Sequence, residues 1–175
     1  MKNKKALYLL LSANAVSGMA QGISMLAIPW YFADVLKQSS NFGIMYGTAT
    51  ILSLFWGLYV GTLIDKYSRK NIFLTISIVG TLFIGSIAAF GFYNNGLSAI
   101  GIGAVFCYTM FVYNIHYPTL YAFGQEISDK KDYRKINSLI EVQGQSTSII
   151  AGALAAVLIT GINTDLLTKL GLANF

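Results

Sequence analysis

The chain has 175 residues, of which 55% are hydrophobic and only 11% are charged, and its mean hydropathy is +0.59. A soluble globular domain carries about a quarter charged residues, so this composition excludes one. The net charge of +5 lies in short clusters between long apolar runs, which is typical of an integral membrane protein and argues against a nucleic acid partner.

Five transmembrane helices are predicted from four charge-free runs. Each run exceeds the roughly 18 residues that mark a spanning helix. The third run, residues 71–125, is long enough for two helices, and Asn94, Asn95 and Gly96 supply turn chemistry near its middle. No run shows the alternation of a barrel strand, so an all-α transmembrane bundle is expected. The predicted helices span residues 6–33, 42–64, 72–92, 97–123 and 139–160.

Lysines and arginines set the predicted orientation. Ten of the twelve precede the first helix or lie between helices two and three or four and five, whereas the opposite side receives only Lys37 and Lys169. The positive-inside rule therefore places the N-terminus in the cytoplasm of a cell that carries the protein in its plasma or inner membrane. Residues 1–162 are expected to form the helical domain, and residues 163–175 a short external segment.

The sharpest local signal is residues 61–70, between the second and third predicted helices. Asp65 is placed to meet Arg69 or the positive N-terminal end of a neighbouring helix. An ordinary basic loop with one solvated aspartate has the same composition. The pattern nevertheless resembles the loop signature of the major facilitator superfamily, with Ser68 in place of the family's second glycine. The matching residues are Gly61, Leu63, Asp65, Lys66, Arg69 and Lys70.

The resemblance extends over most of the chain and looks nearest to the macrolide-efflux-like, or drug:proton antiporter, branch. Weaker motifs carry that finer placement: Ser17 with Gly18, residues 29–31, Pro118 and residues 134–156. The family likeness implies a secondary transporter whose two six-helix halves rock around a central site, with the loop signature as a cytoplasmic latch. This chain would supply helices one to five of the N-terminal half, without the sixth helix.

The same likeness implies the partners of the protein. They are the lipid bilayer, an exported small amphipathic molecule and the missing C-terminal half of the same transporter. A different class of protein, a small non-transporting membrane scaffold or partner subunit, is the alternative. No phosphate loop, zinc spacing or nucleophile with a paired base is found, so neither an enzyme nor a cofactor or metal site is expected.

Polar residues within spanning segments are functional candidates because they are costly in lipid. Asn14 and Gln21 in helix one and Asn114 and His116 in helix four are the candidates for a substrate cavity, since the family likeness places these helices around the central site. Each side chain could instead hydrogen-bond a neighbouring helix, worth about 0.6 kcal/mol on average. Glu141 is interpreted as a boundary charge near the end of helix five.

Helix five carries small residues at four-residue spacing, which places them on one face and permits close helix contact. This stripe resembles an antiporter motif of the family, although the proline typical of that motif is missing. Simple tight packing within one half is the favoured explanation of the stripe. Its members are Gly144, Ser148, Gly152 and Ala156.

Overall fold

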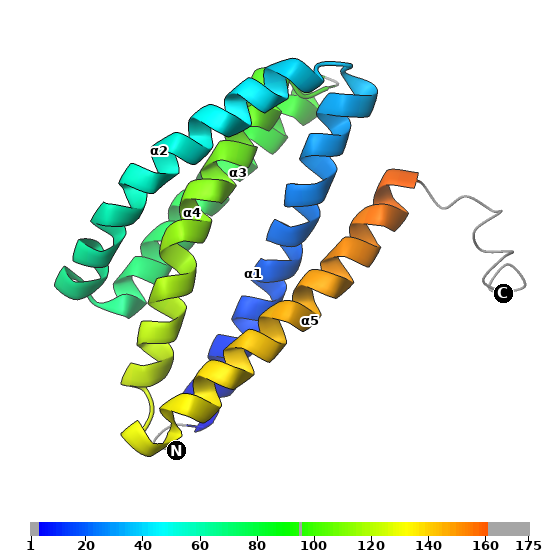
Figure 1. Ribbon diagram of the computed structural model, residues 1–175. Helices are drawn as coiled ribbons and strands as arrows, with labels where there is room; N and C mark the ends of the chain where they lie inside the picture. The colour runs from blue at the N-terminus through cyan, green and yellow to red at the C-terminus, as the bar shows by residue number, and fades with distance from the viewer. Residues whose placement is uncertain (1–3, 95, 161–175) are drawn as a thin grey trace, which may run out of the picture.

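The computed structural model describes residues 4–94 and 96–160 and confirms the predicted all-α bundle (Figure 1). All five helices are long and apolar enough to cross a membrane, and the described residues contain no strand. The predicted external segment, residues 163–175, lies outside the described residues. The helices are α1 (Lys4–Trp30), α2 (Ser39–Lys66), α3 (Arg69–Tyr93), α4 (Ala99–Glu126) and α5 (Tyr133–Thr160).

The long apolar run divides into α3 and α4 at the predicted turn. Asn94 donates its side-chain amide to the carbonyl of Phe90 at 2.8 Å, and Ser98 caps α4 by accepting from the amide of Gly101 at 3.0 Å. Both bonds satisfy backbone groups that a helix end leaves unpaired. The turn chemistry seen in the sequence therefore ends one helix and starts the next.

The predicted start of helix five is wrong by six residues. A short 3₁₀ turn, Lys130–Asp132, leads into α5 at Tyr133, so Arg134 and Lys135 already belong to the helix. Hydropathy finds only the apolar part of a helix, whereas long basic side chains let the helix continue beyond it with their charges in water. A second departure is at the C-terminal end of α1, where a turn of π-helix, Tyr31–Val35, extends the helix past Pro29.

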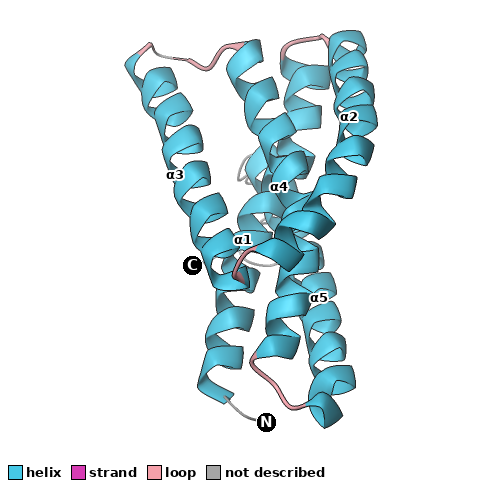
Figure 2. Cartoon of the chain, turned by 90° about the vertical axis from the view of Figure 1, so that its left-hand side faces the viewer, coloured by secondary structure: helices cyan, strands magenta, loops and turns pink. Residues whose placement is uncertain are grey.

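Two helix pairs organise the bundle. α1 packs along α5 and α2 along α4, while α1 meets α4 at the centre. Figure 2 shows α2 and α3 on opposite sides of α4. Exchanging the first helix with the fourth and the second with the fifth maps one pair onto the other. The same exchange maps α3, which packs beside α4, onto a sixth position beside α1, and none of the five described helices occupies that position.

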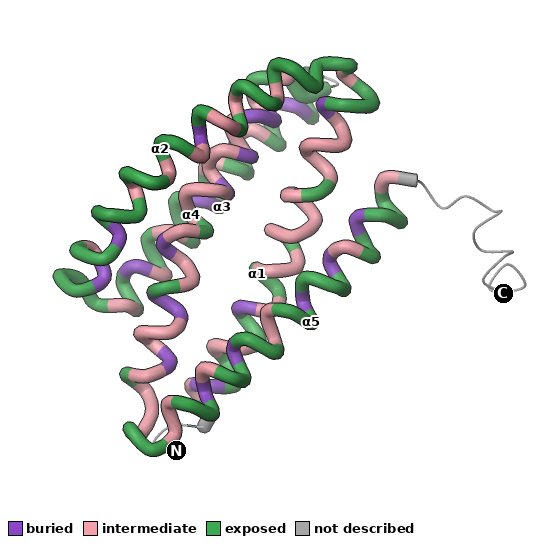
Figure 3. Tube along the Cα trace, in the orientation of Figure 1, coloured by how far each residue is buried: buried purple, intermediate pink, exposed green. Residues whose placement is uncertain are grey.

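The basic clusters gather at one end of the bundle. In Figure 1 the start of α1 and the turn between α4 and α5 lie side by side at the bottom, and the turn between α2 and α3 lies toward the same end, further up and to the left. Two small clusters of buried apolar side chains hold the helices together. One includes Leu7, Leu120 and Ile140, and the other includes Val60 and Ile72. Many large apolar side chains are instead exposed on the outside of the bundle, and Figure 3 shows exposed residues along every helix, as expected when lipid is the solvent.

Candidate functional site

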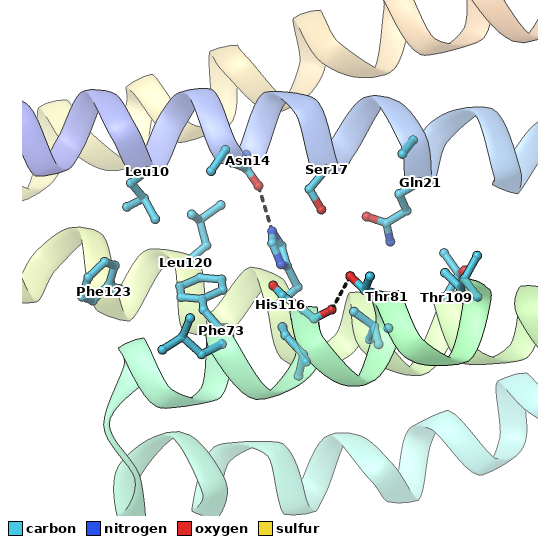
Figure 4. A pocket seen from close by; sticks show the side chains of 18 of the residues that line it. Leu10, Asn14, Ser17, Gln21, Phe73, Thr81, Thr109, His116, Leu120 and Phe123 are labelled. Atoms are coloured by element: carbon cyan, nitrogen blue, oxygen red, sulfur yellow. Dashed lines mark hydrogen bonds between the residues drawn. The ribbon is translucent and has the colours of Figure 1, made fainter. Parts of the chain in front are cut away.

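A cavity of about 960 Å³ lies between α1, α3 and α4 (Figure 4). Its walls are mainly apolar, and polar side chains gather near its middle. Three of the four predicted cavity residues, Asn14, Gln21 and His116, line it. Asn114 does not, because it lies about 200° around α4 from His116. Its amide donates to the carbonyl of Met110 in its own helix at 3.3 Å.

Four side chains form what we call the central network, which joins α4, α1 and α5. His116 Nε2 lies 2.8 Å from Asn14 Oδ1, and Asn14 donates from Nδ2 to Gln143 Oε1. Gln143 in turn donates to Thr147 Oγ1 at 2.8 Å. Because an amide oxygen only accepts, His116 donates through Nε2 in this arrangement. Asn14 is only 5% exposed, so its hydrogen bonds replace those that water would make.

Gln21 differs from the other cavity residues. Its Nε2 is buried and finds no hydrogen-bond partner among the residues that the structure describes. A buried amide donor without a partner costs about 1–3 kcal/mol. Gln143 and Thr147 were not predicted as site residues. Their four-residue spacing on one helix face is the signal that could have found them.

The small residues of α5 contact α1 through a face next to the predicted stripe. Of that stripe, Ser148 and Ala156 are exposed, and Gly144 and Gly152 are only half-buried. Thr147 and Ala151, each one position earlier, are buried and meet Gly18 and Gly22 of α1. Gly152 of the predicted stripe also faces α1, since a Cβ there would lie 3.7 Å from Cδ1 of Leu26. The closest contact with α1 thus runs along a small face next to the predicted stripe.

Two glycines of α1 make the close contact with that buried face. A Cβ on Gly22 would lie 2.6 Å from the Cβ of Ala151, and one on Gly18 would lie 3.1 Å from Cγ2 of Thr147. The first distance is shorter than real side chains adopt. Close approach of α1 and α5 thus requires glycine at residue 22.

The loop signature lies at the basic end of the bundle and is mostly helical. Asp65 is exposed near the end of α2, and the described residues give it no ion pair with Arg69. Arg69 instead points to α4, where its guanidinium lies 3.7 Å from Glu126 Oε2. Gly61 has open space around it, so no described helix packs closely against it.

A second polar region, which we call the tyrosine face, joins α4 to α5. Glu141 Oε2 accepts a hydrogen bond from Tyr121 at 2.7 Å, and Oε1 accepts one from Gln145 Nε2 at 2.9 Å. One and two turns earlier on α4 lie Tyr117 and Tyr113, whose ring centroids are 4.6 Å apart. None of these residues lines the cavity between α1, α3 and α4. Glu141 is thus more than a boundary charge, since it links two helices.

Five long apolar helices in one bundle define a multi-pass membrane protein. The family model of the Major Facilitator Superfamily matches residues 1–161, and the chain therefore belongs to this superfamily. That result confirms the family resemblance drawn from the loop signature and indicates a membrane transporter. Neither a curated protein nor a solved structure matches the chain.

Proposed function

We propose that the chain forms the first five helices of the N-terminal half of a secondary transporter that exports small amphipathic molecules by alternating access. The observation that carries this proposal is the matched pairing of α1 with α5 and of α2 with α4. Such matched pairs are expected from two inverted three-helix repeats, the building plan of each half of a major facilitator transporter.

The repeat also gives the cavity a role. A sixth helix would pack against α1 as α3 packs against α4, along the open side of the cavity. Gln21 Nε2, buried without a partner among the described residues, would then meet that helix. On this proposal the central network fastens helices together. The substrate path lies on the side of the bundle away from this cavity, between this half and the C-terminal half.

The loop signature supports the alternating-access part of the proposal. Its exposed Asp65 carries no ion pair with Arg69, while Arg69, at the start of α3, pairs with Glu126, at the end of α4. Asp65 is therefore available to meet a helix N-terminus of the other half when the basic end of the bundle closes. The basic residues at this end support a cytoplasmic orientation for it by the positive-inside rule. The export direction and the macrolide-efflux-like branch are part of the same proposal.

The test is a cellular accumulation assay with the full reading frame that contains this chain. Cells expressing it are loaded with a panel of fluorescent amphipathic compounds, and the retained dye is compared with that of cells carrying an empty vector. Lower retention of at least one compound, lost when the membrane energy source is collapsed, supports an exporter. Equal retention across the panel, together with a native product of five helices by mass spectrometry, would indicate the scaffold instead.

A further inference from the structure

We propose that the tyrosine face binds a lipophilic organic cation, with Glu141 as the counter-charge and the rings of Tyr113 and Tyr117 as its aromatic wall. This inference rests on the proposed transport function, because it names the substrate class. It concerns residues outside the cavity between α1, α3 and α4.

The first argument is the position of a carboxylate in a spanning helix. Glu141 follows Lys135, the last basic residue before it, by six residues, or about 9 Å along the helix axis. From residue 142 to residue 160 the helix carries no charge. An ionisable side chain at such a place is costly and is a functional candidate by default.

The second argument is that the partners of Glu141 are neutral. Tyr121 and Gln145 each donate one hydrogen bond to it, and no lysine or arginine within the described ranges forms an ion pair with it. A carboxylate offers about four lone-pair positions, of which two are used here. Among the described residues no cation therefore compensates a charge on Glu141, which has acceptor positions left and is exposed on the helix surface.

The third argument is the wall of aromatic rings beside this charge. Tyr113, Tyr117 and Tyr121 follow one another at four-residue spacing, so their rings lie above one another along α4. The ring centroids of Tyr113 and Tyr117 are 4.6 Å apart with an interplanar angle of 46°, and Tyr113 is 46% exposed. Ring faces attract a cation within about 6 Å, most strongly when water is excluded.

Small and polar side chains form the side of α5 next to the aromatic wall. Glu141, Gln145 and Ser148 share one exposed face of the helix, because separations of four and seven residues return to the same side. Gly144 lies beside this face, and a Cβ there would lie 3.9 Å from the hydroxyl oxygen of Tyr117. At Gly144 the small-residue stripe of α5 therefore comes into contact distance of the aromatic wall. A large apolar body with one delocalised positive charge fits this combination.

The experiment measures binding of two probes of the same shape and opposite charge to the purified full-length protein in lipid nanodiscs. The probes are tetraphenylphosphonium, a cation without a titratable group, and tetraphenylborate, the corresponding anion. The wild-type protein is expected to bind the cation and to discriminate against the anion. Glu141→Gln, which keeps the shape and removes the charge, is expected to weaken cation binding by at least about tenfold. Tyr113→Leu is expected to weaken it by about 2- to 30-fold.

Matched controls separate this site from general effects of charge and aromatic area. Glu126→Gln removes another carboxylate, at the end of α4, and Tyr59→Leu removes another exposed tyrosine, on α2. Both controls are expected to bind the cation as the wild type does. Equal cation binding by wild type and Glu141→Gln, or equal binding of both probes by the wild type, would overturn the proposal.

The outcomes for the site and for the transporter are distinguishable. Charge-selective binding that depends on Glu141, in a protein that moves no compound in cells, would support the site and reject the exporter. Export of tetraphenylphosphonium that is unchanged in Glu141→Gln would support the exporter and reject the site.

Discussion

The central network and the tyrosine face both place hydrogen-bonded polar side chains within the helix bundle, but one is buried and the other is exposed. In the central network, Asn14 uses both its donor and its acceptor on other helices and is almost fully buried. In the tyrosine face, Glu141 is exposed and its hydrogen-bond partners are neutral. A polar group within a membrane span fastens helices where its partners use all its hydrogen-bonding capacity. Where they do not, the group remains available to a ligand.

The largest expected effect tests the packing that brings α1 and α5 together at the central network. Gly22→Val is expected to lower the free energy of unfolding by about 1–3 kcal/mol, because its side chain overlaps Ala151. Gly57→Val is the control, since a Cβ at Gly57 has open space around it. Denaturant titration in detergent measures both variants. Equal stability of the two variants would mean that α1 and α5 are not in close contact.

The next effect separates polarity from packing. Asn14→Leu removes the hydrogen bonds to both His116 and Gln143, and we expect a loss of about 1–2 kcal/mol of unfolding free energy. Asn114→Leu is the matched control, because the hydrogen bond of Asn114 goes to Met110 in its own helix. The same titration compares them. Binding of tetraphenylphosphonium by Asn14→Leu should equal that of the wild type. A loss of binding together with the loss of stability would mean that the central network and the tyrosine face belong to one binding site.

A third prediction concerns the loop signature, whose effect on the export rate should be the same for every exported compound. Asp65→Asn is expected to slow export about 2- to 5-fold, because its interaction with a helix N-terminus is worth about 0.3–1 kcal/mol when exposed. Membrane insertion should be unchanged. Asp34→Asn, which breaks an exposed pair with Lys37 beyond α1, serves as the control. Wild-type efflux from Asp65→Asn would remove the latch assignment.

The smallest effect is expected at His116. His116→Ala removes one hydrogen bond to Asn14 and should lower the unfolding free energy by about 0.6 kcal/mol, while export continues at the wild-type rate. Thermal unfolding and the cellular accumulation assay are measured on the same preparation of variants. A change in which compounds are exported would show that His116 contacts substrate, and the cavity would then replace the tyrosine face as the binding region.

The number and type of the helices were predictable because lipid offers no hydrogen bonds to an exposed backbone, so an apolar run of sufficient length must be helical. The turn near Asn94 was predictable from local chemistry alone. The start of α5 was not, because Arg134 and Lys135 are compatible with a helix that continues beyond the apolar core. Polar candidates such as Asn14 and His116 were found from their cost in lipid, but Asn114 shows that cost does not tell which way a residue faces.

Run length, loop charge and the 61–70 signature are local properties, so the sequence alone was enough to predict the membrane helices found in residues 4–94 and 96–160 and the major facilitator superfamily. Which helix faces meet could be seen only in the packed bundle. The shift from the predicted stripe to Ala151, and the pairing of Tyr121 with Glu141, depend on how α5 is rotated against α1 and α4. That rotation follows from the fit of surfaces far apart in the chain, because lipid solvates every apolar face equally well.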